Sequence, residues 1–161
     1  MINTQQNAAS TPLPFVSRAL RLWGEPVPDG EAGVQAFRSV YTDPVLVNGE
    51  PTSLGVLVDR ARMLQQAFEG LRHTVVEQFE APGRLAFAFR LSGRHRGPLV
   101  TPLGVLQPTG AELEVAGMDI FVLDEDLDRV SAIWALADYL TLLLQAGAVA
   151  RLPLAPADQR E

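Results

Sequence analysis

Apolar residues recur every three or four positions through most of the first 70 residues, which is the spacing of helices that bury one face. One helix is predicted over residues 14–23, and a second over 30–43, where an Asp-Pro pair ends it. A third is predicted from an N-cap at Thr52 or Ser53 to a glycine stop at Gly70. The apolar run at 45–47 indicates a short strand between the second and third helices.

From residue 73 onward the apolar positions alternate, which predicts strands that each bury one face. The expected strands lie at 73–81, 84–95, 111–123 and 129–137, and a short helix then closes the fold. Helices first and an antiparallel meander afterwards indicate the α+β class, with a curved antiparallel sheet wrapped around the N-terminal helices. One domain is expected over residues 14–150, between a flexible leader at 1–13 and a flexible tail at 151–161.

Composition narrows the classes of function. The 161 residues carry a formal net charge of −6, which argues against binding to a nucleic-acid backbone. The absence of cysteine excludes disulfides and thiolate chemistry, and it fits a reducing cytoplasm. No apolar run reaches the length of a membrane span, and two histidines without cysteine make a zinc site improbable. We therefore expect a cytoplasmic protein that contacts neither nucleic acid nor membrane and holds no metal or cofactor.

Three ionisable residues conflict with the apolar pattern around them. Alternation places His95 and Asp119 on the apolar faces of their strands, and Asp138 as well if the last strand runs that far; an unpaired charge is costly to bury there. Such conflicts between residue type and pattern often mark functional positions. Each also has a structural alternative: an exposed strand end for His95, a paired core carboxylate for Asp119, and a helix N-cap for Asp138.

Four short motifs follow one another along the second half of the chain. They are Gly93-x-His95-x-Gly97, then Pro108–Thr109–Gly110, then Trp134 with Asp138 four residues on, and a closing set of Leu143, Leu144, Gln145 and Gly147. Together with the predicted elements, over about residues 14–150, this ordered set resembles the SnoaL-like polyketide cyclases. These are also called ester cyclases and belong to the nuclear transport factor 2-like superfamily.

The resemblance implies an α+β cone with an internal apolar pocket, a small hydrophobic polyketide substrate, and homodimers that pair through the outer face of the sheet. Tyr41 and Asn48 are expected to contact the oxygens of the ligand. The apolar wall of the pocket is expected to comprise Trp23, Phe37, Phe87, Phe89, Leu91, Phe121, Trp134 and Leu136.

The resemblance also implies a chemistry. In anthracycline cyclases of this kind, an aspartate near the end of the last strand acts as acid and base in an intramolecular aldol closure, and Asp138 matches it best. Their partner histidine would fall at Met118 or Asp119, where this chain has none. Asp119 and His95 are then expected to polarise or orient the carbonyl group.

Two classes of function stay open. The first is a cyclase that closes a polyketide ring, either by aldol chemistry or by a pericyclic [4+2] route in which pocket shape dominates. The second is a non-catalytic module that holds a hydrophobic ligand or serves dimerisation. Epoxide hydrolysis, as in the limonene epoxide hydrolases of the superfamily, ranks lower because Phe89, Leu91 and Leu136 occupy the positions of its charged residues.

Overall fold

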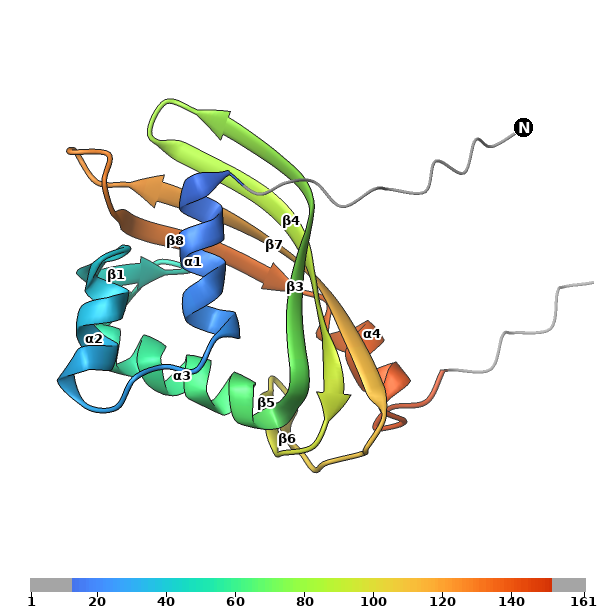
Figure 1. Cartoon of the computed structure of the whole chain (residues 1–161). Coiled ribbons are helices and arrows are strands. Elements are labelled where there is room, and N and C mark those ends of the chain that lie inside the picture. The colour runs from blue at the N-terminus through green and yellow to red at the C-terminus, as the bar shows by residue number, and fades with distance from the viewer. Residues whose placement is uncertain (1–12, 152–161) are drawn as a thin grey trace, which may run out of the picture.

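A curved sheet with helices packed along its concave side dominates the computed structural model, which describes residues 13–151 (Figure 1). Apart from Leu13 and Arg151, the predicted leader and tail lie outside the described residues. The helices are α1 (Pro14–Gly24), α2 (Glu31–Arg38), α3 (Leu54–Ala67) and α4 (Tyr139–Gln145). The strands are β1 (Tyr41–Val47), β2 (Glu50–Thr52), β3 (Phe68–Ala81), β4 (Arg84–His95), β5 (Leu99–Thr101), β6 (Gly104–Leu106), β7 (Glu112–Leu123) and β8 (Val130–Ala137).

The order of strands confirms the predicted α+β class and its curved sheet. Six strands pair in the order β2-β1-β8-β7-β4-β3, and β5 and β6 form a separate hairpin in the connection after β4. The pairs are antiparallel except for β1 and β8, which run parallel. The sequence pattern shows a meander but does not show this parallel pair, because a short apolar run carries no information about its partner.

The boundary between α2 and β1 differs from the prediction. The second helix ends at Arg38 instead of continuing to residue 43, and Tyr41 already belongs to β1. Tyr41 pairs there with Val130 of β8, so long-range pairing overrides the helical spacing of the local apolar residues. The side chain of Tyr41 therefore projects from the sheet.

Helix α3 begins as predicted and ends earlier. The Ser53 hydroxyl accepts a hydrogen bond of 3.4 Å from the backbone N–H of Val56, which is a standard N-cap contact. The helix ends at Ala67 and the chain passes directly into β3 at Phe68. Gly70, the expected stop, lies inside β3 with a φ of +66°, so its conformational freedom serves a distorted strand start.

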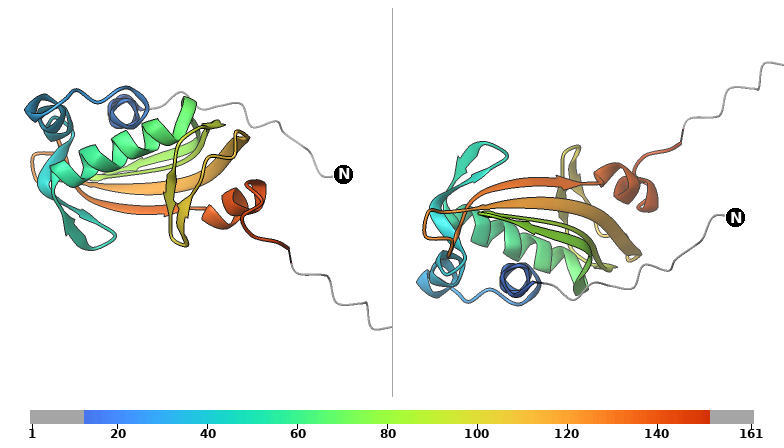
Figure 2. Two further views of the ribbon diagram at one scale, coloured as in Figure 1. Left: turned by 90° about the horizontal axis from the view of Figure 1, so that it is seen from below. Right: turned by 90° about the horizontal axis from the view of Figure 1, so that it is seen from above.

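Helices α1, α2 and α3 cover one face of the sheet, as the two end-on views show (Figure 2). The core between these layers contains a row of aromatic rings. Phe37 stacks on Tyr41 with ring centroids 5.9 Å apart, Tyr41 meets Phe121 at 6.2 Å, and Phe121 meets Phe87 edge to face at 5.0 Å. Two rings of this row, Tyr41 and Phe121, also line a cavity between the helices and the sheet.

Candidate functional site

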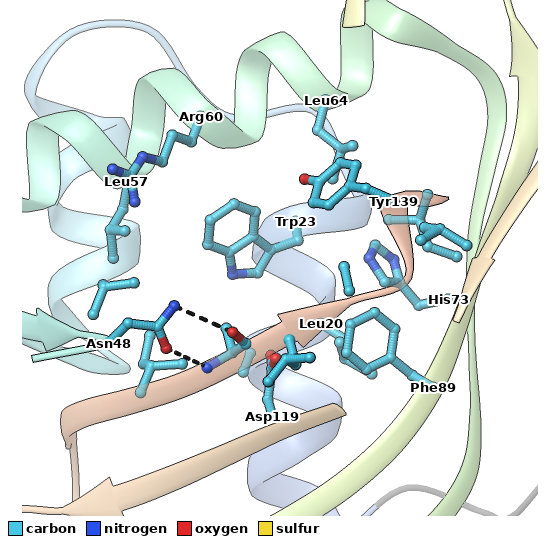
Figure 3. Close-up of a pocket in the computed structure, with 18 of the residues that line it drawn as sticks. Leu20, Trp23, Asn48, Leu57, Arg60, Leu64, His73, Phe89, Asp119 and Tyr139 are labelled. Atoms are coloured by element: carbon cyan, nitrogen blue, oxygen red, sulfur yellow. Dashed lines mark hydrogen bonds between the residues drawn. The ribbon is translucent and has the colours of Figure 1, made fainter. Parts of the chain in front are cut away.

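A cavity of about 370 Å³ opens between the concave face of the sheet and the helices α1, α3 and α4 (Figure 3). Its volume is in the range of small-molecule pockets, and most of its lining is apolar. The lining residues with a polar group are Trp23, Tyr41, Asn48, Arg60, His73, Asp119 and Tyr139. Asn48 and Arg60 are exposed polar members of the lining, so they mark the mouth of the pocket. Leu136 is also exposed and borders the cavity at its edge, but alternation along β8 places its side chain on the outer face of the sheet.

Asp119 supplies a carboxyl group inside this pocket. It lies on β7 opposite Phe87 of β4 and Ala135 of β8, and it shares the inward face of β7 with the buried Phe121. Burial among these apolar groups raises the pKa of Asp119 from 3.8 to about 7. A carboxyl group with a pKa near 7 can both donate and accept a proton at neutral pH.

Tyr41 presents a phenol that stays protonated. The ring is fully buried, and the indole Nε1 of Trp23 donates a hydrogen bond of 3.0 Å to the Tyr41 hydroxyl oxygen. Burial raises the pKa of Tyr41 well above its ordinary value. The Trp23 hydrogen bond opposes this shift, and the charge of Asp119 adds to it. Because the oxygen accepts from Trp23, the Tyr41 O–H is left to donate elsewhere.

His73 brings an uncharged imidazole to the same pocket. It lies on β3 beside Phe89 of β4, with ring centroids 6.1 Å apart (Figure 3). Gly24, at the end of α1, leaves room for the ring, because a Cβ there would lie 3.3 Å from His73 Nδ1. Burial lowers the pKa of His73 to about 4, so at neutral pH the ring carries one N–H donor and one nitrogen acceptor.

Asn48 is held in place by the backbone of the neighbouring strand. Its Oδ1 accepts a hydrogen bond of 2.8 Å from the Ala135 N–H, and its Nδ2 donates to the Ala135 carbonyl at 3.2 Å (dashed in Figure 3). The side chain thus extends the pairing of β1 with β8 beyond Val47. One hydrogen of the Asn48 amide remains for a ligand at the mouth.

Asp138 lies outside this lining and serves as the N-cap of α4. Its carboxylate accepts hydrogen bonds from the Thr141 N–H at 2.9 Å and the Thr141 hydroxyl at 2.6 Å. These bonds, led by the one from the hydroxyl, lower the pKa of Asp138. At the other end of α4, the Gln145 side chain bonds both the N–H and the carbonyl of Glu114. Asp138 and Gln145 therefore fix α4 against the end of the sheet.

His95 also lies outside the lining, fully buried beneath Phe68. Its Nδ1 accepts a hydrogen bond of 3.2 Å from the Thr109 N–H and lies 3.1 Å from the Thr109 hydroxyl oxygen. Burial lowers the pKa of His95, and a backbone hydrogen bond with Gly97 opposes that shift. The imidazole thus links the end of β4 to the Pro-Thr-Gly turn, so the Gly-x-His-x-Gly and Pro-Thr-Gly motifs are in direct contact.

The glycines that flank His95 have a packing reason. A Cβ on Gly93 would lie 3.2 Å from the Cβ of Phe68, and one on Gly97 would collide with the Gln66 carbonyl oxygen. The N–H groups of Arg96 and Gly97 both donate to the Ala67 carbonyl, at 2.8 and 3.1 Å. The end of β4 therefore packs against the backbone where α3 becomes β3, and side chains at these glycines would separate them.

The structure brings together eight of the sequence-predicted site residues around the cavity. They are Trp23, Tyr41, Asn48, Phe89, Leu91, Asp119, Phe121 and Leu136. Phe37 and Phe87 belong to the aromatic row of the core. Trp134 differs from the expectation: its side chain is 53% exposed and lies on the outer face, because Ile133, Ala135 and Ala137 are the residues of β8 that point inward.

Three polar residues of the lining were not identified from the sequence: His73, Arg60 and Tyr139. His73 lies two residues before the buried Val75, so strand alternation assigns it an inward face. Arg60 lies three residues after Leu57 and four before Leu64, which is the spacing of one helix face. The sequence pattern could therefore have indicated that His73 and Arg60 face the pocket.

Within residues 13–151, no group of three or more His, Cys, Asp or Glu side chains is arranged to hold a metal ion. None of the helices described here is long and apolar enough to cross a membrane.

Comparison with known proteins places this geometry in a family. The family model of the SnoaL-like polyketide cyclases matches residues 29–146. No curated protein matches the chain in sequence. Among solved structures, TsrD from Streptomyces laurentii is 17% identical with a TM-score of 0.68, over 84% of this chain and 93% of that one.

Two further structures share the fold. AclR from Streptomyces galilaeus, a candidate hydroxylase, is 15% identical with a TM-score of 0.64, over 87% of this chain and 85% of its own. IdmH from Streptomyces antibioticus, a candidate polyketide cyclase, is 15% identical with a TM-score of 0.63, over 83% of this chain and 96% of its own. At these identities the structures establish the fold, and the family match covers most of the domain. The chain therefore belongs to the SnoaL-like polyketide cyclase family.

Proposed function

We propose that this protein closes a ring in a polyketide-type intermediate, with Asp119 as the acid and base. The observation that carries the proposal is a carboxyl group with a pKa of about 7 inside an otherwise apolar pocket. Because its pKa lies near the working pH, the group can take a proton from carbon and return it to oxygen in one catalytic cycle. We assign this role to Asp119 in preference to Asp138, because Asp138 is exposed and occupied in capping α4.

In the aldol version, the Asp119 carboxylate removes a proton from a carbon next to a carbonyl group. The enolate that forms attacks a second carbonyl of the same molecule, which makes the carbon–carbon bond. The new alkoxide then takes the proton back from Asp119, so product and substrate have the same mass. The Tyr41 O–H and the neutral His73 N–H are suited to stabilise the developing oxyanion, since both are donors that stay uncharged at pH 7.

The pocket's apolar wall supplies the second part of the mechanism. Holding two reacting carbons close together without water can contribute roughly 7–11 kcal/mol to lowering the barrier. In a pericyclic [4+2] closure this positioning would carry most of the catalysis, and Asp119 would only polarise a carbonyl group. The two versions therefore differ in how much they depend on the Asp119 proton.

An assay of Asp119→Asn separates these versions. Synthetic poly-β-ketone thioesters serve as substrates, and a product of unchanged mass is detected by liquid chromatography with mass spectrometry. The aldol route predicts a loss of roughly 10²–10⁴-fold in kcat, whereas the pericyclic route predicts a loss within about tenfold. Asp138→Asn is the matched control, because it removes a charge at the same end of the sheet without touching the pocket, and it should retain activity.

The second candidate function is a binding module without turnover, favoured by the predominance of hydrocarbon in the lining. Catalytic conversion of any substrate in this assay, abolished in Asp119→Asn, would exclude it. Binding of the same thioesters without conversion, unaffected by Asp119→Asn, would support it instead.

We also propose that the protein pairs as a homodimer through the outer face of its sheet. Met118 lies opposite Leu136 and Ile120 lies opposite Trp134 across β7 and β8. All four side chains are at least 36% exposed and form two apolar cross-strand pairs on one surface. A contiguous apolar patch of this kind is characteristic of an interface.

A further inference from the structure

Arg60 is a charged residue on the pocket-facing side of an otherwise apolar helix face. Leu57 and Leu64 lie three residues before and four residues after it, and all three side chains line the cavity. Figure 3 shows the Arg60 side chain leaving α3 on the side of the pocket. Arginine at such a position interrupts the apolar stripe, and this conflict between pattern and residue type calls for a reason.

The Arg60 guanidinium has no partner among the described residues. The other α3 arginine, Arg62, is paired with Asp59 and Asp29 and bonds the Pro28 carbonyl, whereas Arg60 makes no ion pair or hydrogen bond within residues 13–151. The residues at helical spacing from Arg60 are all apolar, so α3 itself offers no counterion. Its five N–H donors are therefore available to a ligand.

Arg60 is also the permanent charge of the cavity lining. Asp119 has a pKa near 7, and His73 is neutral above about pH 4. The remaining lining groups are apolar or uncharged. A positive charge at the mouth and an apolar interior together fit a ligand with an apolar body and one anionic end.

We infer that the pocket takes an apolar substrate bearing a carboxylate, which binds Arg60 at the mouth while the apolar body reaches Asp119. A planar guanidinium matches a carboxylate with two parallel hydrogen bonds. Arg60 is the single permanent cation of the lining, since His73 is neutral at pH 7, and one cation suits a monoanion better than a doubly charged phosphate. The inference rests on the proposed function, since it names the substrate class for the same pocket.

A pair of probes that differ only in charge tests this inference. Binding of 2-naphthoate and 2-naphthamide to the full chain is measured by isothermal titration calorimetry at low salt. The wild type should bind the naphthoate at least tenfold more tightly, and the preference should shrink at high salt. Arg60→Gln should remove the preference with an unchanged melting temperature, because Arg60 is exposed. Arg84→Gln is the charge-matched control on the distant β3–β4 hairpin and should retain it.

Equal affinity of the wild type for the two probes, binding of neither at millimolar concentration, or a preference that survives Arg60→Gln would overturn the inference. The experiment is independent of turnover. If the cyclase proposal fails, ring closure is absent or does not depend on Asp119, while the preference for the naphthoate that depends on Arg60 persists. If the Arg60 inference fails, the preference is absent while the dependence of ring closure on Asp119 stands.

Discussion

The indole nitrogen of Trp23 donates a hydrogen bond of 3.0 Å to the hydroxyl oxygen of Tyr41, across the junction between α1 and the sheet. The two residues come from different layers of the fold, and their contact sets the direction of the Tyr41 O–H. Because the Tyr41 ring also stacks on Phe37 and meets Phe121, it has little freedom to rotate away. The donor that faces the pocket is therefore held in place by contacts with three neighbouring aromatic side chains.

Replacing Trp23 by Phe should reduce catalysis without removing any of the groups proposed to transfer a proton to the substrate or to stabilise the oxyanion. The Tyr41 oxygen would lose its donor, and its O–H could turn away from the substrate. We expect kcat to fall by roughly tenfold, while Tyr41→Phe, which removes the donor itself, falls by roughly 10²-fold. Steady-state kinetics of the two single variants and the double variant would measure this. Additive losses in the double variant would contradict a shared role.

Two titrating groups in the pocket have opposite effects on stability. Folded Asp119 keeps its proton up to about pH 7, whereas an unfolded aspartate loses it near 3.8, so this group makes stability fall as pH rises through that window. Folded His73 stays neutral down to about pH 4, whereas an unfolded histidine takes up a proton near 6.5. His73 therefore makes stability fall as pH decreases, and the two slopes oppose each other between pH 4 and 6.5.

Single substitutions should unmask these slopes. Relative to the wild type, Asp119→Asn should gain stability steadily from pH 4 to pH 8, by an amount of the order of 4 kcal/mol for a shift of about three pKa units. His73→Gln should gain stability in the opposite direction, from pH 7 down to pH 4. Urea unfolding at five pH values measures both. Curves that run parallel to the wild type would show that neither pKa is displaced in the folded protein.

The sequence pattern located the strands better than it located their faces. In β7 charged and apolar residues alternate over residues 112–115, and extending this alternation along the strand places Asp119 on the inward face. In β8 the run "VSAIWALA" has an apolar residue at almost every position, so alternation could not decide between Trp134 and Ala135. The neighbouring strands show that Ala135 is the inward residue, because it lies opposite Asp119 and its backbone N–H and carbonyl are both hydrogen-bonded by the Asn48 side chain.

Residues of the motifs that carried the family resemblance make structural hydrogen bonds outside the pocket. His95 with Thr109 and Asp138 with Thr141 each hold a turn or a helix end in place. Motifs of this kind are readable because they are local in sequence. The pocket's own chemistry is dispersed over β1, β3, β7 and α3, and only the fold brings His73, Asp119 and Arg60 to one cavity. No local spacing could have shown that they share it.

A buried His95 should matter for stability and not for chemistry. His95→Ala would remove the bond to Thr109 and leave a space beneath Phe68, at a cost of roughly 2–3 kcal/mol. We expect the melting temperature to fall while kcat and its pH profile stay within twofold, measured well below the new melting temperature. His73→Gln should do the opposite at pH 7, with a lower kcat and a nearly unchanged melting temperature. Loss of activity in folded His95→Ala would return this residue to the catalytic machinery.

Phe89 and Gly117 lie directly opposite each other on β4 and β7, and the ring occupies the space that a side chain at 117 would need. A Cβ on Gly117 would lie 2.6 Å from the Phe89 Cζ atom. Gly117→Ala should therefore push the ring into the pocket, with a cost of about 1–3 kcal/mol in stability and weaker binding of bulky ligands. Adding Phe89→Leu to Gly117→Ala should recover much of the loss. Two losses that simply add would contradict the contact.

The outer face of the sheet offers the test of the proposed dimer. Trp134 and Ile120 face each other there, beside Met118 and Leu136, so a charge placed among them would have to be buried in a paired molecule. We expect the wild type to sediment as a dimer at micromolar concentration and Trp134→Lys as a folded monomer. Leu103→Lys, an equally drastic change on the exposed β5–β6 hairpin, should remain dimeric. A monomeric wild type, or a Trp134→Lys dimer of unchanged affinity, would rule out this face as the interface.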